Sequence, residues 1–226
     1  MITDSRMTAF INSLDHGNTP FLDRLEQQAR KDRVPVIRRE TQSFLKTILE
    51  MQKPGSVLEI GTAVGFSAIL MAGATAPECR ITTIEDYEKR IPVAQKNFRE
   101  SGYADRITLL KGDAADVLKT LSDPFDFIFL DAAKAQYIRY LPDLLRLMRP
   151  GSVLVSDNVL QGGDIIESHY AVERRNRTIY RRMREYLRVL KDSDVLETSI
   201  LPLGDGVTIS VYKSGYRANM ENSVSG

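Results

Sequence analysis

The sequence contains little cysteine and histidine, and it has no long hydrophobic run. Its 226 residues include one cysteine, Cys79, and two histidines, His16 and His169. A single cysteine excludes an internal disulfide and a thiolate metal cluster, and so few histidines argue against a zinc site. No apolar run reaches the length of a membrane helix, and the first residues lack the apolar core of a signal peptide. We therefore expect a cytoplasmic protein with no membrane partner.

The chain also lacks an excess of charge of either sign. Its 31 Lys and Arg residues face 30 Asp and Glu residues, which gives a formal net charge of +1. Without a global positive field, any nucleic-acid partner must be met by a local basic patch. The composition is that of a soluble globular protein, and the length suits one large domain with a full core.

From residue 56 onward, short aliphatic runs alternate with helical patterns. The expected strands cover 56–60, 80–85, 107–111, 125–130, 152–156, 194–201 and 207–212. The expected helices cover 67–73, 88–101, 115–122, 136–147 and 171–191. This alternation predicts an α/β fold, Rossmann-like and doubly wound, with a mostly parallel seven-stranded sheet. The short, glycine-containing link at 202–206 predicts that the last two strands form an antiparallel hairpin.

The two ends of the chain differ from this central part. Residues 1–52 predict a helical arm packed on the core, with Pro20 at the first turn of one helix and apolar residues at helical spacing after it. The arm could also act as a lid or a dimer surface. Residues 53–213 would form the main domain, and the small polar residues 214–226 predict a disordered tail.

Residues 57–67 predict a strand, a glycine turn and a helix in succession. Gly61 has no Cβ, so a ligand can lie against the main chain there, beside the N–H groups of the helix. Glu59 is unusual in an apolar strand, because a buried carboxylate needs a partner. Glu85 ends the next strand at the spacing expected of a ribose-binding carboxylate. The alternatives are plain turn glycines and a Glu85 that helps to start a helix.

Oxygen-bearing side chains follow several strands, at the edge where ligands gather in such sheets. They are Glu85, Asp113, Asp131, Asp157 and Asn158. Asp131, Asp157 and Asn158 together offer the hard oxygen ligands that suit Mg²⁺. The alternative is that Asp131 caps a helix while Asp157 and Asn158 begin a loop.

Four ordered motifs resemble those of the metal-dependent catechol and caffeoyl-CoA type O-methyltransferases. They are LEIGTAVGFS at 58–67, GDA at 112–114, LDAAK at 130–134 and SDNVL at 156–160. Within this family the chain is most similar to the bacterial tRNA 5-hydroxyuridine methyltransferases, which methylate a wobble uridine. The segments at 34–37 and 202–206 and the arginine-rich segment after Asn158 carry that similarity.

The resemblance implies a cofactor, a metal and a catalytic lysine. S-adenosylmethionine would lie against Ile37, Glu59, Gly61, Ser67, Glu85, Asp113, Ala114 and Asp131. A Mg²⁺ ion would be bound by Asp131, Asp157 and Asn158. Lys134 would lie near the acceptor hydroxyl and could act as general base, although a solvated lysine at a helix start is the alternative. The resemblance also implies a homodimer.

The acceptor is the harder question. The arginines Arg174, Arg175, Arg177, Arg181 and Arg182 can bind phosphates, which favours the anticodon region of a tRNA as the substrate. A solvated helix face is the alternative for them. The rival activity is methylation of a small catechol-like molecule. The chain has no tryptophan, whereas caffeoyl-CoA type relatives commonly have one where this sequence has residues 160–163.

Two hypotheses come from other classes of protein. An NAD-dependent dehydrogenase would share the glycine turn and Glu85, but it has no need of the three metal-ligand candidates. A catalytically silent RNA-binding module would use the arginines alone, and the presence of Lys134 with the ligand candidates argues against it.

Overall fold

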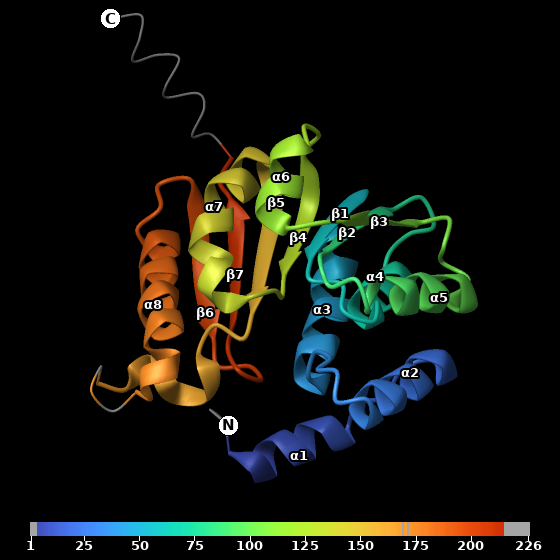
Figure 1. Ribbon diagram of the computed structural model, residues 1–226, viewed down its shortest axis with the longest axis horizontal. Helices are drawn as coiled ribbons and strands as arrows, with labels where there is room; N and C mark the ends of the chain where they lie inside the picture. Colours follow the sequence, from blue (N-terminus) through green and yellow to red (C-terminus); the bar gives the residue numbers. More distant parts are fainter. Residues whose placement is uncertain (1–3, 169, 171, 215–226) are drawn as a thin grey trace, which may run out of the picture.

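The computed structural model describes residues 4–168, 170 and 172–214, and these contain one seven-stranded sheet (Figure 1). Its strands, in the order β3-β2-β1-β4-β5-β7-β6, confirm the predicted doubly wound arrangement. The strands are β1 (Ser56–Ile60), β2 (Arg80–Glu85), β3 (Ile107–Lys111), β4 (Phe125–Leu130), β5 (Met148–Asp157), β6 (Leu196–Leu201) and β7 (Val207–Tyr212).

Strands β1 to β5 pair in parallel, whereas β7 pairs antiparallel with both β5 and β6. The predicted C-terminal hairpin is therefore confirmed. Because β2 and β3 extend from one side of β1 while β4 and β5 extend from the other, the strand order reverses beside β1. This reversal opens a crevice at the carboxyl ends of β1 and β4, where such folds bind ligands.

Helices cover both faces of the sheet and bury two separate hydrophobic clusters (Figure 1). In β4, Phe127 and Phe129 join the cluster under α3 (Arg39–Gln52), α4 (Phe66–Gly73) and α5 (Ile91–Ser101). Ile128 and Leu130 point the other way, under α6 (Ala114–Thr120), α7 (Tyr137–Arg146) and α8 (Arg177–Lys191). Both sides of each central strand are buried, which explains the unbroken apolar runs.

The N-terminal segment is helical, as predicted. It consists of α1 (Ser5–Ser13), α2 (Pro20–Lys31) and α3. The Thr19 side chain caps α2 by accepting a hydrogen bond from the Leu22 N–H, with Pro20 at the first position. Leu22, Leu25 and Ala29 of α2 belong to the first hydrophobic cluster. The division of the chain at residues 52 and 213 stays a prediction, and the expected tail lies outside the described residues except for Ser214.

Several predicted bounds are wrong, chiefly around the last helix. The continuous helix predicted over 171–191 begins only at Arg177, after two short 3₁₀ segments, η2 (Gln161–Ile166) and η3 (Arg174–Asn176). Gly162 and Gly163 adopt left-handed backbone angles that interrupt η2. Elsewhere β5 begins at Met148 rather than at 152, β6 at Leu196 rather than at 194, and α5 at Ile91 rather than at 88.

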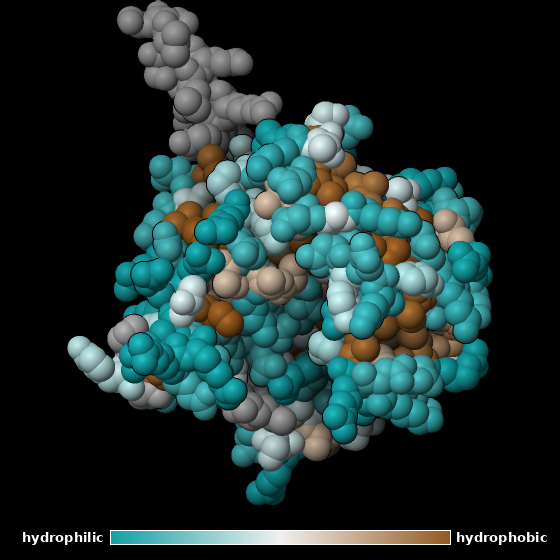
Figure 2. All heavy atoms as spheres, in the orientation of Figure 1, coloured by the Kyte–Doolittle hydropathy of each residue, from teal (hydrophilic) through white to brown (hydrophobic). Residues whose placement is uncertain are grey.

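The surface in Figure 2 is covered mostly by hydrophilic residues, with hydrophobic ones in small separate areas. In the part of the chain that the structure describes, no helix is both long and apolar enough to cross a membrane.

The amino end of the sheet, opposite the crevice, is held by Asp126. Its carboxylate accepts hydrogen bonds from the N–H groups of Gly55 (2.9 Å) and Ser56 (3.1 Å) and from the Arg149 guanidinium. Burial raises the pKa of this carboxyl, but the Arg149 hydrogen bond and the two N–H donors outweigh it and leave a lowered pKa. The folded chain therefore favours the ionised carboxylate, which joins β1, β4 and β5 at this end.

We predict that Asp126→Asn lowers the free energy of unfolding by about 1–3 kcal/mol at pH 7, because charge-assisted hydrogen bonds are lost. A lowered pKa stabilises the fold above the ordinary carboxyl pKa, and this contribution is lost as the pH falls through the folded value. The difference between variant and parent should therefore shrink toward pH 3 in denaturant titrations. Asp123→Asn, at an exposed position, is the control; an equal effect of both changes would contradict the assignment.

Candidate functional site

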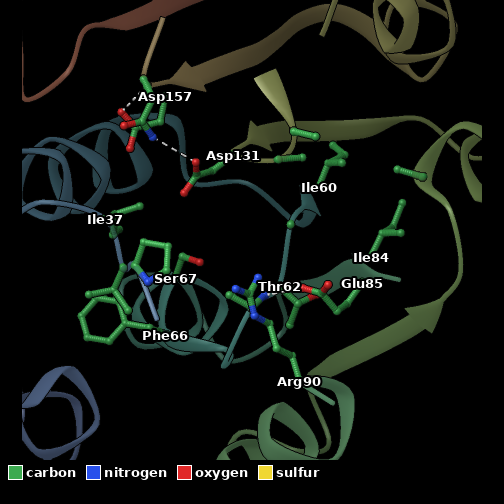
Figure 3. Close-up of a pocket in the computed structure, with 18 of the residues that line it drawn as sticks. Ile37, Ile60, Thr62, Phe66, Ser67, Ile84, Glu85, Arg90, Asp131 and Asp157 are labelled. Carbon is green, nitrogen blue, oxygen red and sulfur yellow. Dashed lines mark hydrogen bonds between the residues drawn. The ribbon is translucent and has the colours of Figure 1, made fainter. Parts of the chain in front are cut away.

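A cavity of about 600 Å³ lies at the carboxyl ends of β1, β2, β4 and β5 (Figure 3). Its wall comes from the turn after β1, the ends of β2 and β4, the loop after β5 and residues 35–38 of the N-terminal segment. The volume is within the range of sites that bind small molecules and cofactors. Among the predicted site residues, those that line it are Ile37, Gly61, Ser67, Glu85, Ala114, Asp131, Lys134, Asp157 and Asn158.

Gly61 is required by chain packing. Its φ is +103°, and a Cβ at this position would lie 2.1 Å from the backbone carbonyl oxygen of Asp131. No residue with a side chain fits that approach, so Gly61 lets the turn after β1 pack directly against the end of β4. Contact of its backbone with a ligand stays a prediction.

The Glu85 carboxylate organises the glycine turn. One oxygen accepts a hydrogen bond from the Ala63 N–H (2.7 Å), and the other accepts one from the Tyr87 N–H (3.0 Å). Ala63 has a positive φ of 47°, an uncommon conformation that the Glu85 contact holds in place. The carboxylate also lines the cavity, beside Arg90 (Figure 3), so its remaining lone pairs can accept from ribose hydroxyls.

Two predicted cofactor residues do not line the cavity. Asp113 instead caps α6, where its carboxylate accepts a hydrogen bond from the Ala115 N–H (2.7 Å). Glu59 is fully buried behind the wall, and its Oε2 accepts a hydrogen bond from the Thr83 hydroxyl. Burial raises the pKa of Glu59 to about 7, against the lowering effect of the Ser67 and Thr83 hydroxyls. Within the described residues its Oε1 has no hydrogen-bond partner.

Two carboxylates and an amide converge on the other half of the cavity (Figure 3). The Asn158 side-chain amide donates a hydrogen bond to Asp131 Oδ1 (3.1 Å), and the Asn158 backbone N–H donates one to Asp157 Oδ1 (2.7 Å). Burial, together with the charge of the neighbouring Asp131, raises the pKa of Asp157 to about 7. Burial also raises the pKa of Asp131, while the charge of Lys134 opposes this. Such a cluster attracts positive charge.

These three side chains suit a hard cation. In residues 4–168, 170 and 172–214, no three His, Cys, Asp or Glu side chains are placed to hold a metal, so a cation here needs the amide oxygen of Asn158. A 180° rotation of the Asn158 side-chain amide would exchange its oxygen and nitrogen and turn the oxygen toward the carboxylates. The two orientations have nearly the same shape, so the rotation needs no other change. Two carboxylates and one amide oxygen would leave open positions for water or an acceptor, as Mg²⁺ prefers.

An ion pair that was not predicted from the sequence closes one side of the cavity. Arg38, just before α3, donates two hydrogen bonds to the Asp205 carboxylate (2.9 and 2.8 Å), in the turn between β6 and β7. Both residues line the cavity. Gln42 donates to the Ile37 carbonyl (2.9 Å) and so holds Ile37 against the opening. The only sequence signal was the position of Asp205 within the motif at 202–206, and nothing pointed to Arg38 as its partner.

The predicted arginines lie outside the cavity wall. Arg174 and Arg175 belong to η3 rather than to α8, and Arg175 pairs with Glu173 (2.7 Å). Arg177 donates to the Val172 carbonyl, and Arg182 donates to the Ala135 carbonyl. Arg181 is exposed on α8. Two of the five thus hold neighbouring segments, and RNA binding stays a prediction for all five.

Comparison with known proteins agrees with this geometry. A model of the O-methyltransferase family matches residues 12–213. A catechol O-methyltransferase of Mycobacterium tuberculosis is 37% identical over 161 residues, which are 70% of this chain and 73% of that protein. Caffeoyl-CoA O-methyltransferase 1 of Eucalyptus globulus is 32% identical over 176 residues, which are 74% of this chain and 70% of that protein.

Solved structures show the same fold. A Podospora anserina methyltransferase bound to SAH (S-adenosylhomocysteine) superposes with a TM-score of 0.84 at 27% identity, covering 92% of this chain and 94% of that one. A Bacillus cereus O-methyltransferase in complex with SAH gives 0.82 at 26% identity, covering 94% and 100%. The match of the family model over nearly the whole sequence shows that this chain belongs to the O-methyltransferase family.

Proposed function

We propose that this protein transfers a methyl group from S-adenosylmethionine to one of two adjacent hydroxyls on a small planar, catechol-like molecule, with the help of a divalent cation. The observation that carries this proposal is the convergence of Asp131, Asp157, Asn158 and Lys134 in the same cavity as the glycine turn and Glu85. The sequence alone favoured a tRNA acceptor. The named catechol and caffeoyl-CoA O-methyltransferases support the small acceptor instead.

Each half of the cavity has its own task in this proposal. The turn at Gly61, the Ser67 hydroxyl and the Glu85 carboxylate would bind the nucleoside end of the cofactor. S-adenosylmethionine supplies an activated methyl group, and a cation such as Mg²⁺ lowers the pKa of a hydroxyl that it binds. Asp131, Asp157 and Asn158 would hold that cation, and their direction would fix which acceptor oxygen faces the methyl group. This placement matters because the transfer is an in-line displacement.

Lys134 would take the acceptor proton. It starts η1 (Lys134–Gln136), with three residues between it and the end of β4, lines the cavity, and places its charge beside Asp131 and Asp157. From this position the amine can accept the hydroxyl proton as the oxygen attacks the methyl group. Ile37, held by Gln42 and backed by the pair of Arg38 with Asp205, would exclude water from the reacting atoms.

The direct test is transfer of labelled methyl from S-adenosylmethionine to catechol. We expect methylated catechol with added Mg²⁺, loss of at least about 90% of the product with a chelator, and no product from phenol, which has a single hydroxyl. Product that is independent of the chelator would overturn the role of the cation. Absence of product from every catechol tested would overturn the small acceptor.

Removal of one proposed cation ligand should impair the cation-binding half of the cavity and leave the cofactor-binding half intact. We predict that Asp157→Asn reduces Mg²⁺-dependent turnover by about 100-fold or more, because the site loses a charge at nearly unchanged shape. The affinity for S-adenosylhomocysteine, measured by calorimetry, should stay within about twofold. Asp116→Asn, an exposed change on α6, serves as the control. Joint loss of cofactor binding and thermal stability would show that Asp157 acts in folding instead.

A hydroxylated uridine in tRNA is the second candidate acceptor. Its 5-hydroxyl lies next to a ring carbonyl oxygen, so it offers an adjacent pair of oxygens like that of catechol. The observation that favours it is the exposure of Arg174 and Arg181 near α8, the helix that contacts the turn next to Lys134 through Arg182. Exposed arginines at this place can bind a phosphate backbone.

A paired variant tests this second candidate. We predict that Arg174→Ala combined with Arg181→Ala raises the KM for tRNA from cells lacking the gene by about tenfold, since phosphate contacts supply much of such affinity. The KM for catechol should not change. The matched control is Lys96→Ala combined with Arg99→Ala on the exposed side of α5. Equal methylation of tRNA by both double variants, or no methylation of tRNA by the parent protein, would exclude these arginines as the tRNA contact.

A further inference from the structure

Behind the carboxylates, a fully buried tyrosine links the ends of two strands. The hydroxyl of Tyr137, the first residue of α7, lies 3.2 Å from the carbonyl oxygen of Leu130 and 3.1 Å from that of Asp157. Leu130 is the last residue of β4 and directly precedes Asp131. One hydroxyl proton is therefore shared between the main chains at the two points from which the carboxylates project.

This link is needed because β4 and β5 part at this edge. Their parallel pairing ends at Leu130 and Ser156. Beyond it, the Asp131 N–H donates to the Ile60 carbonyl (3.0 Å), which draws the end of β4 toward β1. Asp157 remains paired with Val207 of β7, which draws the end of β5 the opposite way. Among the described residues, the Tyr137 hydroxyl bridges the main chains of the two ends, in addition to the side-chain hydrogen bond between Asn158 and Asp131.

Tyr186 of α8 supports the bridge from behind. Its ring meets that of Tyr137 edge-to-face, with centroids 5.6 Å apart and planes at 76°. Its hydroxyl shares a hydrogen bond with the Ser156 hydroxyl (2.7 Å), one residue before Asp157. Both rings are completely buried, so neither has the freedom to move away.

We propose that Tyr137 is a positioning residue that sets the separation of the Asp131 and Asp157 carboxylates so that both can bind one cation. This inference rests on the proposed metal-dependent function. Mg²⁺ requires near-ideal octahedral geometry at about 2.0–2.1 Å, so a small divergence of the strand ends removes one carboxylate from reach. Residues that hold metal ligands in place typically contribute 10–100-fold to metal affinity.

The test is Mn²⁺ binding, followed by electron paramagnetic resonance, to the full-length protein and its Tyr137→Phe variant. Phenylalanine keeps the ring in the core and removes only the bridging hydroxyl. We expect a 10–100-fold weaker Kd for Mn²⁺, with the Kd for S-adenosylhomocysteine, measured by calorimetry, within about twofold of the parent. Tyr103→Phe, a half-buried tyrosine that packs with the cluster on the other face of the sheet, is the matched control and should change neither constant.

The outcomes separate this inference from the proposed function. A parent protein that binds no Mn²⁺ overturns the metal-dependent function and this inference with it. If the parent binds Mn²⁺ and Tyr137→Phe binds it equally well, only the positioning role is overturned. The positioning role is also overturned if the Tyr137→Phe variant loses affinity for Mn²⁺, affinity for S-adenosylhomocysteine and melting temperature together. Should Tyr137→Phe fail to fold, Tyr186→Phe takes its place, with an expected loss of about threefold or more in Mn²⁺ affinity alone.

Discussion

The close approach of Gly61 to the Asp131 carbonyl is the contact on which the site depends. A Cβ at residue 61 would lie 2.1 Å from that oxygen, so the two chain segments touch main chain to main chain. One segment begins the turn that Glu85 organises, and the other carries Asp131 and leads into Lys134. The two halves of the cavity are therefore joined by backbone. A movement of either half is transmitted to the other, because packed backbone has no soft side chain to absorb it.

Buried negative charge is the second constraint. Asp157 and Glu59 both have a pKa raised to about 7, and burial is the main cause in each case. They differ in what surrounds them. Glu59 faces threonine and serine hydroxyls behind the cavity wall, whereas Asp157 faces Asp131, Asn158 and the charge of Lys134 inside it. A carboxylate pair in the wall of a cavity can exchange its proton for a cation, while a carboxyl buried in the core depends on hydrogen-bond donors such as these hydroxyls.

Much of the fold could be predicted from the sequence, because the strands are buried on both faces and alternate with helices. The first four strands were placed to the residue. The segment between Asn158 and Arg177 could not be placed, since its glycines break the helical pattern without showing which way the chain turns. In the site, motif positions located Asp131, Asp157 and Asn158. The link through Tyr137 and the pair of Arg38 with Asp205 could not be foreseen, because each joins segments whose proximity only the folded sheet decides.

The pair of Arg38 with Asp205 also determines when the cavity wall is completed as the chain is synthesised. The two residues are 167 positions apart, so one side of the cavity is built from an early and a late part of the chain. A nascent chain that has emerged only as far as β5 already carries the glycine turn, Asp131 and Asp157. It still lacks β7, which continues the sheet beyond β5, and the turn that receives Arg38. This side of the cavity wall is thus completed only after the turn between β6 and β7 has been made.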